Sequence, residues 1–75
     1  MTIDELIELE FKLYLERYQA WQDSKECDDT AKLMASESER ILRQLYRLKY
    51  NPKDERAEMI GYINFMADLG SKIKL

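Results

Sequence analysis

The chain has 75 residues, enough for a single domain spanning residues 1–75, and a net charge of −3. It contains no histidine and one cysteine, which excludes an internal disulfide, a zinc site and any catalytic pair that includes histidine. Two glycines, one proline and 36% charged residues are typical of an all-α protein. We expect no metal and no cofactor, because the sequence has neither a glycine-rich phosphate loop nor a calcium-loop pattern.

The lone thiol, Cys27, lies in a polar stretch, which predicts a surface position in a reduced, cytoplasmic protein. The first residues are acidic and lack the pattern of a signal peptide. The sequence also contains no run of 18 apolar residues, so we expect no membrane span.

The first predicted helix covers residues 3 to about 23. Thr2 and Glu5 have the spacing of a capping box, which marks its beginning. Two adjoining apolar stripes run along it, one formed by Ile7, Phe11, Tyr14, Tyr18 and Trp21 and the other by Leu6, Leu9, Leu13 and Ala20. A helix with two such stripes is wedged between other elements, so we expect it to be central to the fold or to an oligomer.

The second predicted helix follows a polar loop and begins at Asp29 or Thr30, either of which can cap it. Its inward stripe is expected to contain Ala31, Met34, Ser38, Ile41, Leu45 and Leu48, widened by Ala35 and Leu42. Leu33 lies among polar residues, which indicates partial exposure or an interface. Asn51 and Pro52 predict a short turn, with Asn51 as the cap of the next helix and Pro52 at its first position. The alternative is a continuous helix kinked at these residues, which the extended preference of the residue before proline disfavours.

The third predicted helix extends from Pro52 to Gly70, which should end it in a left-handed cap. Its main apolar face is expected to carry Met59, Ile60, Ile63, Met66 and Ala67, with Tyr62, Phe65 and Leu69 on a neighbouring face. Gly61 lies opposite the main face, where it would permit another chain to approach closely. The basic tail, residues 71–75, either frays or packs Ile73 and Leu75 onto the bundle.

Together these elements predict a small three-helix bundle, in which the long first helix packs on an antiparallel hairpin of the second and third. The first and third helices carry more apolar surface than so small a core can bury. We therefore expect a homodimer or a higher oligomer.

Charge is unevenly distributed along the chain. Residues 1–29 carry nine acids and three bases, whereas residues 30–75 carry nine bases and six acids. The concentrated bases are Arg40, Arg43, Arg47, Lys49 and Lys53, with Tyr46 and Tyr50 between them. This basic stripe predicts either ion pairs with acids of the first helix or a surface that binds a nucleotide or a nucleic acid. The acidic composition favours the ion pairs.

The large apolar side chains suggest a surface that binds another protein, because exposed aromatic residues and methionine are enriched in interfaces. The candidate anchors are Tyr14, Tyr18, Trp21, Leu33, Tyr62 and Phe65. We expect a non-enzymatic adaptor or inhibitor that binds a larger protein. In size, helicity and acidity the chain resembles small accessory and inhibitor proteins carried by phages and plasmids, a likeness of class that transfers no residues. The alternative is an oligomer that binds an anionic ligand through the basic stripe.

Overall fold

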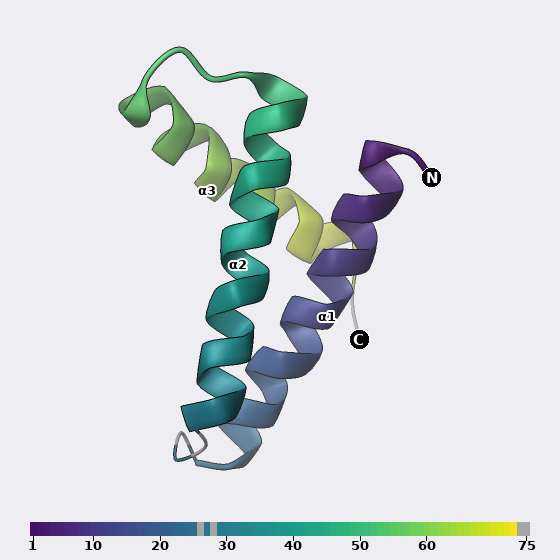
Figure 1. The fold of residues 1–75 in the computed structure, drawn as a ribbon, viewed down its shortest axis with the longest axis vertical. Helices are drawn as coiled ribbons and strands as arrows, with labels where there is room; N and C mark the ends of the chain where they lie inside the picture. The colour runs from purple at the N-terminus through teal and green to yellow at the C-terminus, as the bar shows by residue number, and fades with distance from the viewer. Residues whose placement is uncertain (26, 28, 74–75) are drawn as a thin grey trace.

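The computed structural model describes residues 1–25, 27 and 29–73. Three helices account for most of this part of the chain, α1 (Ile3–Asp23), α2 (Asp29–Tyr50) and α3 (Glu55–Lys72), and it contains no strand (Figure 1). The prediction of an all-α protein with three helices is therefore confirmed.

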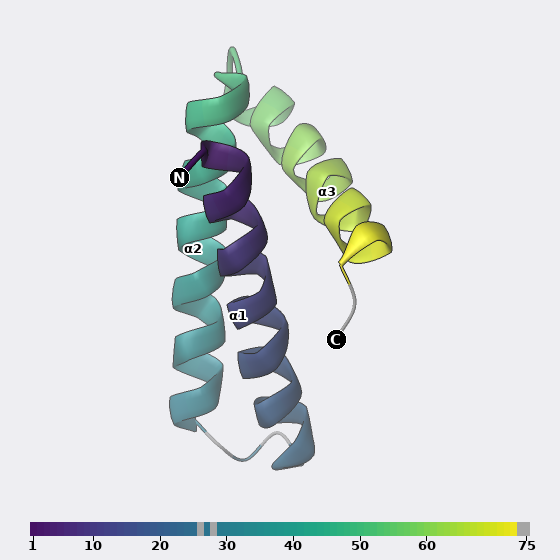
Figure 2. The same ribbon diagram turned by 90° about the vertical axis from the view of Figure 1, so that its right-hand side faces the viewer.

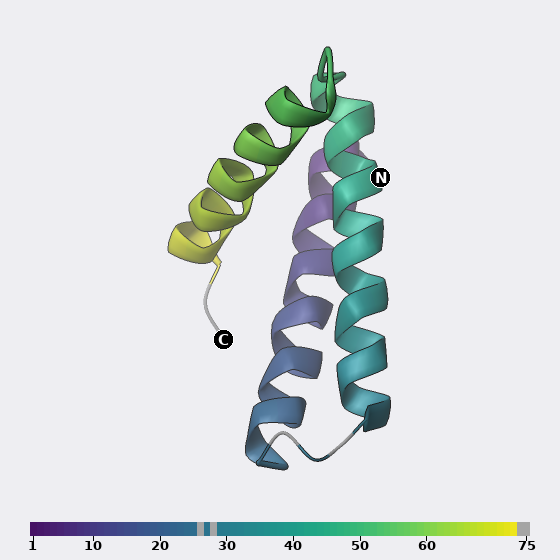
Figure 3. The ribbon, with the colours of Figure 1, turned by 90° about the vertical axis from the view of Figure 1, so that its left-hand side faces the viewer.

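The helices are arranged as a hairpin with one helix beside it. α1 and α2 run antiparallel and pack against each other along most of their length. After the turn that follows α2, α3 returns and crosses the hairpin diagonally (Figure 1). Views from both sides show that α3 lies on one side of the layer formed by α1 and α2 (Figures 2 and 3). The main pairing is thus between α1 and α2, and α3 covers one side of this pair.

Local sequence determines where the helices begin and end. Thr2 and Glu5 form the predicted capping box at the beginning of α1. The prediction for α3 was wrong by a few residues, because Asp54 caps it by accepting a hydrogen bond from the Ala57 amide. Asn51 instead ends α2: its φ is 46°, and its amide donates to the Arg47 carbonyl. Asparagine tolerates this left-handed conformation better than most residues.

The core is small and lies where the three helices meet. It consists of Ile7, Phe11, Leu42, Tyr46 and Tyr62, and Ala31, Ala35 and Ser38 continue the buried face of α2. Partly buried side chains pack around it, including Ile3, Tyr14, Phe65 and Leu69. Ile73 also packs on this cluster, as one of the two predictions for the tail requires, whereas Leu75 lies outside the described residues.

The predicted inward stripe of α2 was right in part, and on α3 the neighbouring face rather than the main apolar face is directed to the core. On α2 the buried side chains are Ala31, Ala35, Ser38, Leu42 and Tyr46, whereas Met34, Ile41 and Leu48 are exposed. On α3 the residues directed to the core are Glu58, Tyr62, Phe65 and Leu69, whereas Met59, Ile60 and Ile63 are exposed. Each helix carries two apolar stripes at helical spacing, so periodicity identifies both stripes without showing which one another helix covers.

The two glycines of α3 have different surroundings. A Cβ atom at Gly61 would lie 1.8 Å from the Tyr46 hydroxyl oxygen, so Gly61 permits a close approach of α2 within the same chain. Gly70 has open space around its Cβ position, and it does not form the predicted left-handed cap. α3 continues through Gly70 to Lys72 and is capped by Ile73.

Replacing each glycine by alanine tests this contact. We expect Gly61→Ala to lower the free energy of unfolding by about 1–2 kcal/mol, because overpacking against the buried Tyr46 ring outweighs the better helix propensity of alanine. Gly70→Ala gains propensity without a clash and should stabilise the protein by about 0.5 kcal/mol. Urea unfolding followed by circular dichroism measures both. Equal effects of the two substitutions would contradict the close contact.

Candidate functional site

An exposed apolar surface with six large side chains lies on the hairpin, on the side away from α3. We call it the hairpin outer face and define it by Leu6, Leu9, Leu13 and Ala20 of α1 and Met34, Ile41 and Leu48 of α2. The six large side chains of this face are 36–75% exposed. On α1, Leu9 and Leu13 each lie two residues from the buried Phe11, and a two-residue step in a helix turns the side chain to nearly the opposite side.

The α2 part of this face also lies opposite α3. Arg43 and Tyr46 contact side chains of α3, whereas Ile41 is two residues from Arg43 and therefore points away from α3. Arg17 links the two helices at the edge of this face. Its guanidinium donates to the Ser38 hydroxyl at 2.5 Å and to the Met34 carbonyl at 3.3 Å. The α1 and α2 stripes are thereby held side by side.

A second exposed apolar surface lies on α3. We call Met59, Ile60 and Ile63 the α3 outer stripe; these side chains are 54–61% exposed. Arg56 precedes them by three to seven residues and shares their side of the helix. The core-facing Tyr62 and Phe65 leave α3 on another side. The protein therefore exposes apolar side chains on both the hairpin and α3.

The predicted aromatic anchors occupy different environments. Tyr14, Tyr18 and Trp21 form a ladder along α1, with successive ring centroids 5.9 and 5.7 Å apart. Tyr18 is exposed, whereas Tyr14 and Trp21 are partly buried. Leu33, on α2, is 68% exposed. The ladder is continuous along one side of α1, but it is not part of either exposed apolar surface.

A small cavity of about 130 Å³ lies beside this ladder, between α1 and α2. The Lys32 ammonium lies over the Trp21 ring, 5.8 Å from its centroid. The Trp21 indole N–H is buried and has no hydrogen-bond partner among the described residues. The cavity is thus already partly covered by a side chain of the protein itself.

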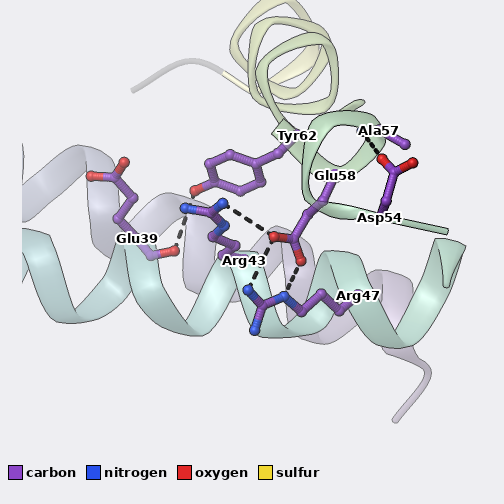
Figure 4. Close-up of polar contacts among 7 residues, drawn as sticks. All are labelled: Glu39, Arg43, Arg47, Asp54, Ala57, Glu58 and Tyr62. Atoms are coloured by element: carbon purple, nitrogen blue, oxygen red, sulfur yellow. Dashed lines mark hydrogen bonds and ion pairs between the residues drawn. The ribbon is translucent and has the colours of Figure 1, made fainter. Parts of the chain in front are cut away.

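Two other predicted anchors belong to the core rather than to the surface. Tyr62 is buried, and its hydroxyl donates to the Glu39 carbonyl at 3.2 Å (Figure 4). Burial, reinforced by the charge of Glu39, raises the pKa of the Tyr62 hydroxyl well above its ordinary value. Phe65 is partly buried, with its ring 5.2 Å from that of Tyr46. In this chain Tyr62 and Phe65 join α3 to the hairpin.

The basic stripe is largely engaged within the protein. The Glu58 carboxylate of α3 is 5% exposed and accepts hydrogen bonds from both Arg43 and Arg47 (Figure 4). The Nη2 atom of Arg43 donates to Glu58 Oε2 at 3.1 Å, and the Nη2 atom of Arg47 donates to the same oxygen at 3.0 Å. Hydrogen bonding by Arg47 is the main reason that the pKa of Glu58 is lowered; burial opposes this effect and Arg43 adds to it. Arg43 and Arg47 thus bind an acid of α3.

The remaining members of the stripe are dispersed. Lys49 pairs with Asp4, the one case in which a predicted ion pair with an acid of α1 is found among the described residues. Arg40 lies 3.7 Å from Glu37 on its own helix, and Lys53 is exposed. Tyr46 is buried, while Tyr50 is about half exposed and lies beneath the Lys49 ammonium. Binding of an anionic ligand stays a prediction.

A cleft of about 380 Å³ lies near the ends of the three helices. Its apolar lining comes from Ile7, Tyr50, Phe65, Leu69 and Ile73, and its charged lining from Asp4, Glu8, Lys49, Asp68 and Lys72. Four of these charges are already paired, Asp4 with Lys49 and Asp68 with Lys72. Because its lining carries both acids and bases, the cleft does not favour one sign of ligand charge.

Comparison with known proteins assigns no family to this chain. No protein-family model matches the chain, and no curated protein or solved structure matches it either. Among the described residues, no group of three or more acidic or cysteine side chains is placed to hold a metal ion. None of the helices, within the part of the chain described, combines the length and apolarity needed to cross a membrane.

Sequence reasoning missed the role of Glu58. It is one of 15 acidic residues. Its position in the first turn of α3, three residues after Glu55, suggests only a favourable interaction with the helix dipole. A usable signal is its spacing with Tyr62 and Phe65: these residues recur at steps of four and three, so Glu58 continues the core-facing side of α3 by one turn.

The Glu58 ion pairs make a testable difference to the pH dependence of stability. Because the pKa of Glu58 is lower in the folded than in the unfolded protein, its contribution is complete above the ordinary glutamate pKa of about 4.3 and is lost as the pH falls through the folded value. We expect Glu58→Gln to lower the urea midpoint at pH 7 and to have a smaller effect at pH 3. The control is Glu16→Gln, which changes an exposed acid of α1. An unchanged midpoint for Glu58→Gln at pH 7 would refute this role.

Proposed function

We propose that the protein is a small helical interaction module that acts as an adaptor or an inhibitor by binding a larger protein. The observation that supports this proposal is the α3 outer stripe. Met59, Ile60 and Ile63 are each more than half exposed, although the same helix buries Tyr62 on its other side. Scattered exposed apolar residues are ordinary, whereas three that lie together over two adjacent turns of one helix suit a partner.

The stripe also indicates what kind of partner surface fits it. Its three side chains have the i, i+1 and i+4 spacing with which one helix face enters an apolar groove or packs beside another helix. Arg56 extends this side of α3 by one turn and is exposed. A partner with an apolar groove and a carboxylate near the Arg56 end would therefore be complementary in both shape and charge.

The ion pairs of α2 bear on the choice between the two functions weighed from the sequence. A surface that binds phosphate needs arginines whose donors are available to the ligand. Arg43 and Arg47 use donors on Glu58, so the charge they could offer to a nucleotide is partly neutralised. The exposed apolar stripe is not subject to such compensation, and for this reason we favour binding to a protein.

The proposal is tested by capture of a partner from native cell extract with the full chain. We expect the wild type to retain a protein in near-stoichiometric amount, and Ile63→Glu to reduce its retention by about 30-fold, as is typical for a central interface residue. Asn64→Glu is the matched control, because it adds the same charge to the next residue of α3, which is also exposed. The proposal fails if no partner is retained, or if Ile63→Glu retains it as well as the wild type.

A further inference from the structure

The hairpin outer face has a property that the α3 outer stripe lacks: apart from Leu9, whose counterpart is Arg17, its apolar positions are symmetric about its middle. On α1, Leu6 and Ala20 each lie seven residues from Leu13; on α2, Met34 and Leu48 each lie seven residues from Ile41. Seven residues are close to two helical turns. Both stripes therefore repeat an apolar side chain at equal distances on either side of a central one.

The two centres also lie at the same level of the hairpin. Asp4 pairs with Lys49 near one end, and Arg17 bonds to Met34 and Ser38 towards the other. Because α1 and α2 run in opposite directions, these contacts place Leu13 of α1 at the same height along the hairpin as Ile41 of α2, to within about one residue. One axis perpendicular to the helices can thus pass through the middle of both stripes.

We propose that a second copy of the chain covers the hairpin outer face, related to the first by a two-fold axis at the level of Leu13 and Ile41. Rotation about this axis places α1 antiparallel to α1 of the second copy and α2 antiparallel to α2. Leu6 then lies opposite Ala20, and Met34 lies opposite Leu48. The result is a dimer in which two two-helix layers pack face to face and each copy's α3 lies on the outside. Its interface is isologous, the most common kind in homodimers.

The surface area of the single chain supports an occupant of this size. Its accessible surface is 5666 Å², whereas a compact protein of 9.0 kDa exposes about 4,900 Å². The surplus of about 800 Å², spread over the whole chain, is as large as the area that each partner buries in a standard stable interface. The radius of gyration agrees, since 12.9 Å exceeds the value of about 11 Å expected for 75 residues.

Charge at the seam of the hairpin is compatible with the same pairing. Glu10 and Arg17 lie on either side of Leu13, so the two-fold axis brings Glu10 of one copy close to the level of Arg17 of the other. Arg17 has five N–H donors and uses a single nitrogen in its bonds to Ser38 and Met34. In the dimer the Glu10 side chain of one copy and the Arg17 guanidinium of the other thus lie at neighbouring levels of the seam with opposite charges.

The dimer is tested by sedimentation equilibrium over a dilution series. We expect the wild type to have twice the chain mass of 9.0 kDa, and Ile41→Glu to raise the dissociation constant by about 30-fold or more, because it sets two carboxylates against each other at the axis. Ile60→Glu makes the same change on the α3 outer stripe and should leave the mass unchanged. A monomeric wild type, or dissociation caused equally by both substitutions, overturns the inference.

Disulfide trapping gives a second readout that does not depend on a destabilising charge. In a Cys27→Ser background, which removes the native thiol, Ile41→Cys places one cysteine of each copy near the axis. Oxidised glutathione should convert this variant to a covalent dimer at least about ten times faster than Ile63→Cys in the same background, since proximity raises the effective concentration. Equal rates would overturn the inference even if the mass were that of a dimer.

These experiments separate the dimer from the proposed function. Loss of partner capture with Ile63→Glu concerns α3, whereas the mass and the trapping at position 41 concern the hairpin outer face. Failure of either one leaves the other result standing.

Discussion

The arrangement of this protein depends on the close approach of the Tyr46 side chain to Gly61. The Tyr46 ring packs against Tyr62 and Phe65, and its hydroxyl occupies the space that a side chain at position 61 would fill. One turn away, the Glu58 carboxylate accepts hydrogen bonds from two arginines of α2. An aromatic contact and a largely buried ion-pair network together hold α3 on one side of the hairpin.

Fixing α3 on that side has a direct consequence for the rest of the surface. A helix that covers one side of a two-helix layer leaves the other side open, and here the open side carries six large apolar side chains. The core that remains inside the chain is small, with Leu42 and Ser38 as its fully buried side chains. Domains of this size commonly gain stability from oligomerisation, which suits a protein whose proposed action is binding.

The two exposed surfaces differ in a way that suggests different occupants. The hairpin outer face is long and, apart from Leu9, symmetric about its middle, so a second copy of the chain fits it. The α3 outer stripe is shorter and ends at Arg56, so a different protein with an acidic group fits it better. A dimer would present this stripe twice, and two linked sites bind a partner with two epitopes more tightly than one site does.

The sequence was sufficient to predict the helices but not the relations between them. Thr2 and Glu5 correctly placed the beginning of α1, because capping is decided by neighbours in the sequence. The third helix began three residues later than predicted, since both Asn51 and Asp54 can cap and only the turn geometry selects Asp54. For α2, Ile41 and Leu42 are adjacent apolar residues on different stripes, and burial of Leu42 rather than Ile41 depends on where α1 and α3 pack.

The candidate site was predictable to a similar extent. Exposed apolar surface was expected from the excess of apolar stripes, and Leu33 and Tyr18 are indeed exposed. Tyr62 could not be assigned to the core from the sequence, because its burial depends on a long-range contact with Tyr46. The same holds for Arg43 and Arg47, whose acceptor is 15 and 11 residues away in the chain.

The most direct test of this account is an isotope-filtered nuclear Overhauser measurement on a mixed sample, in which half of the chains carry labelled methyl groups. The account predicts intermolecular contacts from the Ile41 and Leu13 methyls, and none between copies from the Ile60 and Ile63 methyls. Intermolecular contacts confined to Ile60 and Ile63, or a complete absence of them at Leu13 and Ile41, would contradict it.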